Sequence, residues 1–349
     1  MDMNCKSRID GLVEAARRRG LDSVLVCNQA NIRALTGVNC DNAVLTLSPS
    51  AHSASAKAAI YTDFRYAAMI HRVAPNLACR DLKRLRVSGS RIGYEPSIQH
   101  ARFLVLQKKA PKAEFVDIAD EIELLRAVKT ADEIAGIRAA EALTCRIWED
   151  ASARFKAGMT ERDMVRIIQK MMIERGEGEA FSTIVCVGKN AAECHHEPDD
   201  TVWNGRDCIL ADLGVKLGGV CADLTRNLVA RPSRLYKKVY SIVREASRAA
   251  IAAARPGITG SALDKVARDV ISKAGFGKCF GHSLGHGVGY EVHEAPYASK
   301  SKRGKMVLKP GMTVTVEPGI YLEGNLGVRI EDLILITEDG CEVLSDSPA

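Results

Sequence analysis

Short apolar runs alternate with amphipathic segments through the first third of the chain. We expect strands at residues 22–27, 42–48 and 58–62 and helices at residues 5–19 and 64–73. The segments 88–97 and 108–115 carry Gly, Pro and Lys, which predicts loops or strand edges there. Alternating strands and helices of this size are typical of a small α/β domain.

Helix-start signals are prominent in the rest of the chain. Thr130, Thr160 and Ser261 are each followed three residues later by Glu or Asp, which is the spacing of a capping box. A further amphipathic stretch ends at a Pro-Gly pair, where a helix cannot continue. The predicted helices are 130–155, 160–176, 234–254 and 261–275.

Strand-like pairs separate and follow these helices, at residues 208–229, 279–293 and 312–337. Helices interspersed with antiparallel hairpins indicate an α+β domain. The change of pattern falls within 111–128. We therefore expect a smaller α/β domain at 1–122 and a larger α+β domain at 123–349.

Composition excludes several classes of protein. The chain has 349 residues, 46% of them hydrophobic, and a formal net charge of +6 that is spread along its length. Its first ten residues contain no apolar targeting segment, and its eleven cysteines include no Cys-x-x-Cys pair. We expect a cytoplasmic globular protein that binds neither nucleic acid nor membrane.

Residues 281–294, "GHSLGHGVGYEVHE", contain three of the eight histidines. The segment lacks the second histidine that a zincin helix places four residues after His-Glu, and it lacks the Lys-Ser/Thr of a phosphate-binding loop. Its glycines alternate, which indicates a strand whose other side chains share one face. Any chemistry of these histidines therefore needs partners from elsewhere in the chain.

Two pairs of carboxylates are predicted to face one another across hairpins. A turn centred on Leu217-Gly218 would place Asp212 opposite Asp223. A turn centred on Gly324 would place Glu317 opposite Glu331. Side chains in such pairs lie about 5 Å apart at Cβ, so like charges repel.

Repulsion of this kind is relieved when a carboxylate takes up a proton or when a cation lies between the two. Exposed acids on the polar face of each hairpin are the alternative interpretation. Four carboxylates and one neutral imidazole carry a charge of about −4, which two divalent cations would neutralise. Oxygen ligands with one nitrogen favour Mn²⁺, Co²⁺, Fe²⁺ or Mg²⁺, with Zn²⁺ as a further alternative. Among these ions we expect Mn²⁺ or Co²⁺. Two such ions would activate a water molecule for hydrolysis.

Several segments resemble the pita-bread metallopeptidases, specifically the branch of Xaa-Pro aminopeptidases and Xaa-Pro dipeptidases (prolidases). The resemblance implies an α+β pita-bread catalytic domain preceded by a creatinase-type α/β domain. In the second half these segments are "ADLGVKLGGVCADLTRN", "HSLGHGVGYEVHEAP", "LKPGMTVTVEPGIY" and "GVRIEDLILIT". In the first half they are "NIRALTGV", "YTDFRYA" and "RIGYEP".

The resemblance implies five metal ligands. Asp212 would bind the first ion, His286 and Glu317 the second, and Asp223 and Glu331 both. It also selects His286 among the neighbouring histidines, a choice that the residue pattern alone leaves open.

The resemblance further implies residues that act on substrate. His195 and His293 would donate hydrogen bonds to the scissile region, and Glu317 would shuttle a proton. His282 would lie near the pocket without binding metal. Arg329, on the same strand face as a ligand carboxylate, could orient it through a salt bridge.

The implied substrates are short proline-containing peptides, and the implied assembly is a homodimer. Some prolidases have an arginine just after His-Glu-x-Pro, whereas this chain has Tyr297, although Arg303 or Lys305 could substitute. An Xaa-Pro aminopeptidase is therefore the preferred prediction and a prolidase the alternative. A creatinase-like hydrolase or an inactive binding protein of the same fold is more remote.

Overall fold

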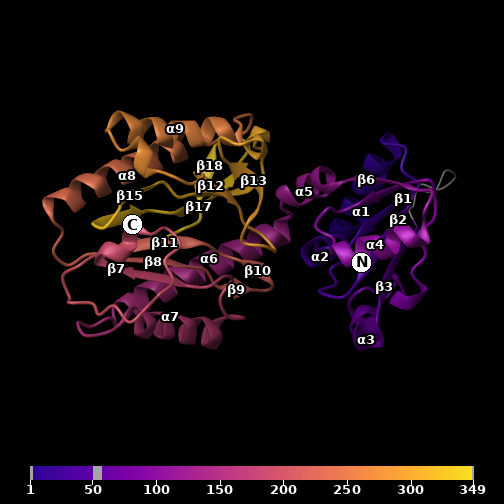
Figure 1. Cartoon of the computed structure of the whole chain (residues 1–349), viewed down its shortest axis with the longest axis horizontal. Helices are drawn as coiled ribbons and strands as arrows, with labels where there is room; N and C mark the ends of the chain where they lie inside the picture. The colour runs from indigo at the N-terminus through magenta and orange to yellow at the C-terminus, as the bar shows by residue number, and fades with distance from the viewer. Residues whose placement is uncertain (1–2, 50–56, 348–349) are drawn as a thin grey trace. The chain divides into compact units, whose positions relative to one another are not determined.

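The structure, a computed structural model, describes residues 3–49 and 57–347. The chain divides into two compact units, Met1–Arg126 and Ala127–Ala349 (Figure 1). The division falls four residues beyond the sequence-derived boundary, which lies inside helix α5 (Ala119–Ala127). Among the helices of the described ranges, none combines the length and apolarity needed to cross a membrane.

The N-terminal unit contains a mixed sheet with the strand order β4-β3-β2-β1-β5-β6, which confirms the predicted α/β architecture. Its strands are β1 (Ser23–Val26), β2 (Val44–Ser48), β3 (Lys57–Thr62), β4 (Ala78–Asp81), β5 (Arg91–Tyr94) and β6 (Glu114–Asp117). Its other helices are α1 (Met3–Arg18), α2 (Gln29–Thr36), α3 (Phe64–Val73), α4 (His100–Lys109) and the short η1 (Leu82–Arg84).

Strand β5 lies within the segment 88–97, which the sequence pattern predicts to be a loop or a strand edge. It is an inner strand, paired in parallel with both β1 and β6, rather than a loop or an edge. A Cβ at Gly93 would lie 2.9 Å from Ile118 Cγ2 and 3.0 Å from Leu21 Cδ1. The glycine that weakened the strand pattern is therefore required by close packing.

The second unit has four long helices. They are α6 (Ala131–Ser152), α7 (Glu161–Arg175), α8 (Arg234–Ala253) and α9 (Gly260–Lys273). Capping boxes at Thr130 and Thr160 are confirmed. The predicted cap at Ser261 is wrong, because the Thr259 side chain accepts from the backbone N–H of Ala262. Asp264 instead accepts hydrogen bonds from Arg268 and from the backbone of Leu284.

Short antiparallel strands fill the space between these helices. They are β7 (Ile184–Val187), β8 (Ile209–Leu213), β9 (Lys216–Leu217), β10 (Val220–Cys221), β11 (Leu224–Leu228), β12 (Gly285–Gly287), β13 (Glu294–Ala298), β14 (Thr313–Val316), β15 (Gly319–Leu322), β16 (Leu326–Arg329), β17 (Asp332–Ile336) and β18 (Cys341–Val343). Three short helices, η2 (Gly188–Ala192), η3 (Gly277–Cys279) and η4 (Lys302–Lys305), connect them. The predicted strand pair within 279–293 is wrong, because β12 pairs with β13, which begins after that range.

Helices α6 and α7 lie on one side of the strands, and α8 and α9 lie on the other (Figure 1). One core packs α6 and α7 against β7 and β8 through residues such as Ile137, Ile168 and Ile209. A second core packs α8 and α9 against β14 and β16 through residues such as Val243 and Val328. Two layers of helix therefore support the strands from which the candidate site is built.

The first carboxylate hairpin has a register two residues away from the predicted one. Asp212 pairs with Thr225 rather than with Asp223. The turn lies at Gly218-Gly219, where φ is 60° and 72°, and not at Leu217-Gly218. A two-residue hairpin turn of type I′ needs positive φ at both central positions, and two successive glycines supply it. Because the slip is an even number of residues, Asp212 and Asp223 still point to the same face.

The second carboxylate hairpin follows the predicted register on both sides of its acids. Gly319 pairs with Arg329 in one sheet, and Val316 pairs with Asp332 in the next. Glu317 and Glu331 lie between these pairs, where the chain passes from one sheet to the other. Glu317 and Glu331 therefore lie opposite one another, one on each side of the hairpin.

Substituting Gly218→Ala is expected to lower the free energy of unfolding by about 1–2 kcal/mol, because a Cβ is strained at positive φ. No neighbouring atom lies within 4 Å of the added Cβ, so the effect isolates backbone strain. Urea unfolding followed by the fluorescence of Trp148 and Trp203, both in the second unit, measures it.

Gly340→Ala is the matched control, since its added Cβ also meets nothing within 4 Å and its φ lies outside the left-handed region. This control is expected to be neutral or slightly stabilising. Equal losses of stability in the two variants would contradict the assigned turn.

Candidate metal and peptide site

One pocket of the second unit, with a volume of about 440 Å³, gathers every site residue predicted from the sequence. These residues are His195, Asp212, Asp223, His282, His286, His293, Glu317, Arg329 and Glu331. They come from segments up to 136 residues apart in the chain, so the fold alone brings them together.

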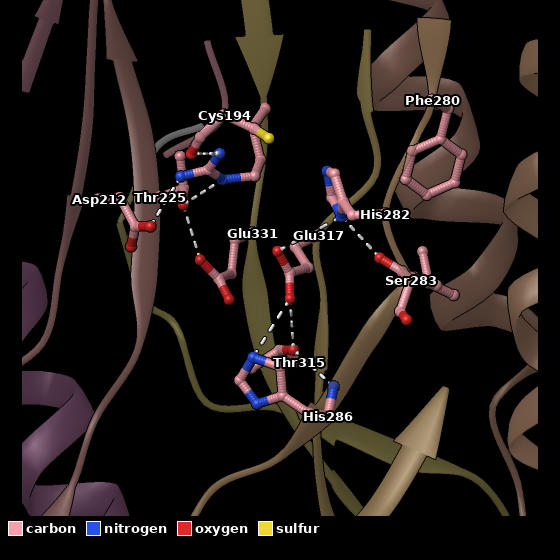
Figure 2. A network of polar contacts seen from close by, with 12 residues as sticks. Cys194, Asp212, Thr225, Phe280, His282, Ser283, His286, Thr315, Glu317 and Glu331 are labelled. Atoms are coloured by element: carbon pink, nitrogen blue, oxygen red, sulfur yellow. Dashed lines mark hydrogen bonds and ion pairs between the residues drawn. The ribbon is translucent and has the colours of Figure 1, made fainter. Parts of the chain in front are cut away.

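Five of these residues form a compact polar cluster. Asp212 lies in β8 and His286 in β12, whereas Asp223, Glu317 and Glu331 lie at the junctions between paired strands. Donor atoms of Asp223, His286 and Glu331 all lie within 4.8 Å of one another. Figure 2 shows Glu317 directed at His286, with Glu331 beside it. The structure therefore brings together the five predicted ligands.

His286 makes the closest contacts of the cluster. Its Nε2 is 3.3 Å from Glu317 Oε1 and 3.7 Å from Asp223 Oδ2. Its backbone N–H donates to Thr315 Oγ1 at 3.0 Å. The imidazole consequently faces acids from both carboxylate hairpins.

The glycines on either side of His286 explain how a strand fits here. A Cβ at Gly285 would lie 1.9 Å from the carbonyl oxygen of Thr315, and one at Gly287 would lie 2.4 Å from that of Ala295. Neither position tolerates a side chain, because both contacts are with backbone. Alternating glycines therefore let β12 pass between its neighbours while the imidazole points into the pocket.

The acids of the cluster destabilise one another in their charged form. Burial, and then the neighbouring carboxylates, raise the pKa of Asp223 and of Glu331 well above their usual range. Burial also raises the pKa of Asp212, against the opposing effect of Arg329. Glu317 differs, because its hydrogen bond with His286 and the imidazole charge outweigh burial and lower its pKa.

A divalent cation fits this donor set. Asp212 Oδ1 is buried and has no hydrogen-bond partner among the described residues, although its other oxygen is bound by Arg329. A buried carboxylate oxygen without a donor is costly, and a bound cation would satisfy it. Carboxylates with one imidazole match the preferences of hard and borderline divalent ions.

Arg329 orients two acids of the cluster, one directly and one through a threonine hydroxyl. Its Nη2 donates to Asp212 Oδ2 at 2.7 Å, and its Nε donates to Thr225 Oγ1 at 3.0 Å. Thr225 in turn donates to Glu331 Oε2 at 2.7 Å. One buried guanidinium thus aligns acids from both hairpins. Thr225 was not predicted as a site residue, although its position two residues after Asp223 placed it on the same face.

Arg329 also reaches His282 through Tyr321, another residue that the sequence did not single out. Its Nη1 donates to the Tyr321 hydroxyl at 3.0 Å. That hydroxyl lies 2.9 Å from His282 Nε2. His282 Nδ1 lies 2.7 Å from the carbonyl oxygen of Ser283 (Figure 2). The carbonyl can only accept, so Nδ1 carries the proton and Nε2 accepts from Tyr321. His282 is therefore turned away from metal binding in this arrangement.

His195 and His293 are exposed residues that line the pocket. His195 follows η2, and His293 immediately precedes β13. The ring centroids of His293 and His286 are 4.2 Å apart. Burial and the charge of His286 lower the pKa of His293. A neutral imidazole at the pocket wall can donate one hydrogen bond to a bound peptide.

A pita-bread α+β unit with converging carboxylates and a histidine in its pocket defines a metal-dependent exopeptidase. The sequence profile of metallopeptidase family M24 matches residues 135–338, and that of the creatinase/prolidase N-terminal domain matches residues 8–128. The chain belongs to metallopeptidase family M24.

Similarity to known proteins extends over almost the whole chain. The uncharacterized peptidase YqhT of Bacillus subtilis is 32% identical, over 94% of this chain and 95% of its own. The crystal structure of the prolidase from Pyrococcus horikoshii has 31% identity and a TM-score of 0.92, covering 98% of this chain and 99% of that one. The X-Pro aminopeptidase from Thermotoga maritima has 32% identity and a TM-score of 0.83, covering 96% and 98%. The predicted family, fold class and metallo-exopeptidase activity are confirmed.

Removal of metal is expected to make the stability of the protein depend more strongly on pH. In the metal-free state the raised pKa values of Asp223 and Glu331 mean that the folded chain binds more protons than the unfolded chain above about pH 4. The free energy of unfolding should therefore fall as pH rises through those values. Ions that bind only the folded state should oppose this loss.

Thermal unfolding of EDTA-treated protein between pH 5 and 8, with and without added Mn²⁺, measures the effect. The double variant Asp223→Asn, Glu331→Gln should flatten the metal-free curve and abolish the response to Mn²⁺. The exposed control Glu338→Gln should behave as wild type. Parallel curves with and without Mn²⁺ in the wild-type protein would contradict the cluster's role.

Proposed function

We propose that the protein is an Xaa-Pro aminopeptidase, which removes the first residue from short peptides whose second residue is proline. The cluster of carboxylates and one imidazole supports a centre of two divalent ions, with Mn²⁺ or Co²⁺ preferred. The near full-length similarity to prolidases and an X-Pro aminopeptidase favours a peptidase over a creatinase-like hydrolase or a binding protein.

In this proposal Asp212 would hold the first ion, His286 and Glu317 the second, and Asp223 and Glu331 both. Divalent ions bound there would act as Lewis acids and lower the pKa of a water molecule. Arg329 favours the ionised form of Asp212 against the effect of burial and fixes its orientation through their 2.7 Å contact.

The chain's own residues would then act on the peptide. Glu317, whose pKa is lowered, is ionised at neutral pH and is placed to accept a proton. His195 and His293 would donate hydrogen bonds to the oxygen of the carbonyl that precedes proline, where negative charge develops. Their exposure on the pocket wall leaves both imidazoles accessible to a bound peptide.

The charge of the pocket wall favours an aminopeptidase over a dipeptidase. Arg329 is the one arginine or lysine among the described residues that line the pocket, and it is already paired with Asp212. Burial lowers the pKa of His282 and of His293, so both are neutral at pH 7. A dipeptide carboxylate would therefore find no unpaired guanidinium or ammonium there, whereas a longer peptide needs none.

Prolidase is the second candidate, and the 0.92 TM-score with a solved prolidase favours it. The guanidinium of Arg303 lies 4.2 Å from the ring centroid of Tyr297, the residue that replaces the arginine of some prolidases. Arg303 is thus near the position from which a carboxylate could be bound.

Metal dependence is the first test of the proposal. The Asp223→Asn variant is expected to lose bound Mn²⁺, as measured by mass spectrometry, together with all hydrolysis of Xaa-Pro-Yaa peptides. In the wild-type protein EDTA should abolish hydrolysis, and Mn²⁺ or Co²⁺ should restore it. The control Asp339→Asn changes an exposed aspartate in the same way and should remain active. An active Asp223→Asn variant with full metal content would refute the assignment.

Turnover of Ala-Pro and Ala-Pro-Ala by the wild-type protein distinguishes the two specificities. An aminopeptidase should cleave the tripeptide at least about tenfold more efficiently, because the dipeptide carboxylate is left without a partner. In that case Arg303→Gln should leave kcat/KM for the tripeptide unchanged. Preference for the dipeptide, with a raised KM in Arg303→Gln, would establish the prolidase alternative.

A homodimer and a cytoplasmic location, both expected from the sequence, stay predictions. Light scattering during size-exclusion chromatography tests the first.

A further inference from the structure

A second group of ionisable side chains lies at one wall of the pocket, outside the carboxylate cluster. Donor and acceptor atoms of Glu161, His196 and Asp199 lie within 4.8 Å of one another. Glu161 is the first residue of α7, and its side chain is completely buried. His196 follows His195, and its side chain is 9% exposed.

The contacts of Glu161 indicate a hydrogen-bonded anchor rather than a cation site. Its Oε1 accepts from the backbone N–H of Val187 at 2.6 Å and from Asn190 Nδ2 at 3.0 Å. Its Oε2 contacts His196 Nε2 at 2.8 Å and accepts from the backbone N–H of Asp199 at 2.9 Å. Four donors occupy the roughly four acceptor sites of a carboxylate, which leaves none for an ion.

The surrounding groups define how His196 is protonated. A carboxylate only accepts, so Nε2 of His196 donates to Glu161. Asn190 Nδ2 also lies 3.2 Å from this nitrogen, but its two hydrogens are directed at Glu161 and at Thr201 Oγ1. The other imidazole nitrogen, Nδ1, lies 3.3 Å from Glu193 Oε2. When His196 is protonated, both nitrogens therefore donate to carboxylates.

Ionisation of His196 agrees with this geometry. Burial lowers the pKa of His196, but the hydrogen bond with Glu161 and the charges of Glu161 and Asp199 outweigh it, so the pKa is raised overall. A buried ion pair in which both partners are hydrogen-bonded holds its backbone firmly, because separating it leaves an unpaired buried charge.

The position of His195 depends on contacts of this kind made by its neighbours. No hydrogen bond or ion pair within the described part of the chain fixes its imidazole, and the residue is exposed. Its backbone is held on both sides, however. The carbonyl oxygen of Cys194 accepts from Arg329 Nη1 at 3.3 Å, and the side chain of His196 is bound to Glu161. The position of His195 in the pocket is therefore set by its two neighbours.

We propose that His196 and Glu161 are positioning residues that hold the segment 188–199, and with it His195, against the peptide. The catalytic consequence rests on the proposed function, since it requires His195 to contact the scissile carbonyl. His195 keeps both imidazole nitrogens available for substrate because its neighbour makes the structural contacts. Loss of the anchor should displace His195 and lower kcat more than it raises KM.

The test compares four full-length, Mn²⁺-loaded proteins: wild type, His196→Ala, His196→Gln and Asp200→Asn. Asp200 is the matched control, because it lies in the same loop, is exposed and is paired with Arg162 rather than with Glu161. The measurements are kcat and KM on Ala-Pro-Ala, Mn²⁺ and Zn²⁺ content, and hydrogen exchange at residues 188–201.

His196→Ala is expected to lower kcat by about tenfold to a hundredfold and to speed exchange in this segment, with unchanged metal content. His196→Gln, which keeps one donor for Glu161, should recover most of the loss, and Asp200→Asn should match wild type. Glu161→Gln should resemble His196→Ala in kcat and in hydrogen exchange. If Glu161→Gln fails to fold, the His196 variants still test the proposal.

Wild-type kcat and exchange in His196→Ala would overturn the proposal. Loss of one bound Mn²⁺ or Zn²⁺ per chain in that variant would also overturn it, in favour of a metal site. If the wild-type protein cleaves no Xaa-Pro peptide, the proposed function fails, and the exchange comparison alone decides whether His196 anchors the segment.

Discussion

Repulsion among buried carboxylates is the constraint on which the catalytic unit depends. Asp212, Asp223, Glu317 and Glu331 form a cluster with one imidazole, that of His286, and burial makes their charged forms costly. One guanidinium cannot neutralise four acids, so divalent cations must supply the remaining charge if all four are ionised. The strands hold these acids close together because their hydrogen bonds, and the two helical layers packed against them, resist the separation that repulsion favours.

The geometry of the strands explains why the cluster could be predicted although one register was wrong. Side chains alternate along a strand, so an even slip in pairing keeps Asp212 and Asp223 on one face. The turn was misplaced because hydrophobic alternation does not distinguish Leu217-Gly218 from Gly218-Gly219, whereas the positive φ at both glycines does. Capping boxes at Thr130 and Thr160 were predictable because both partners are close in sequence. The pairing of β12 with β13 was not, because its register shifts between His286 and Gly287, which the alternation of glycines does not reveal.

The residues that support the site were harder to infer than the ligands, for a physical reason. Thr225 and Tyr321 each act through one hydroxyl that links Arg329 to a second side chain, and nothing in the sequence pattern distinguishes them from ordinary strand residues. Glu161 occupies the first turn of a helix, where an acid is normally explained by the helix dipole. Its contacts with His196 and with the backbone of Asp199 come from an irregular segment whose path the sequence pattern does not specify.

The two histidines proposed to contact substrate, His195 and His293, are held in place in the same way. His195 is followed by His196, which pairs with buried Glu161 at 2.8 Å, and His293 is followed by Glu294, which pairs with buried Lys129 at 2.5 Å. In each case the residue next to the histidine carries a charge that is buried and paired. Breaking either pair would take a contact away from a buried ionisable group, so the backbone at both points is restrained. The imidazoles themselves can then stay exposed, because their location depends on the neighbouring residue and their nitrogens remain available for a peptide.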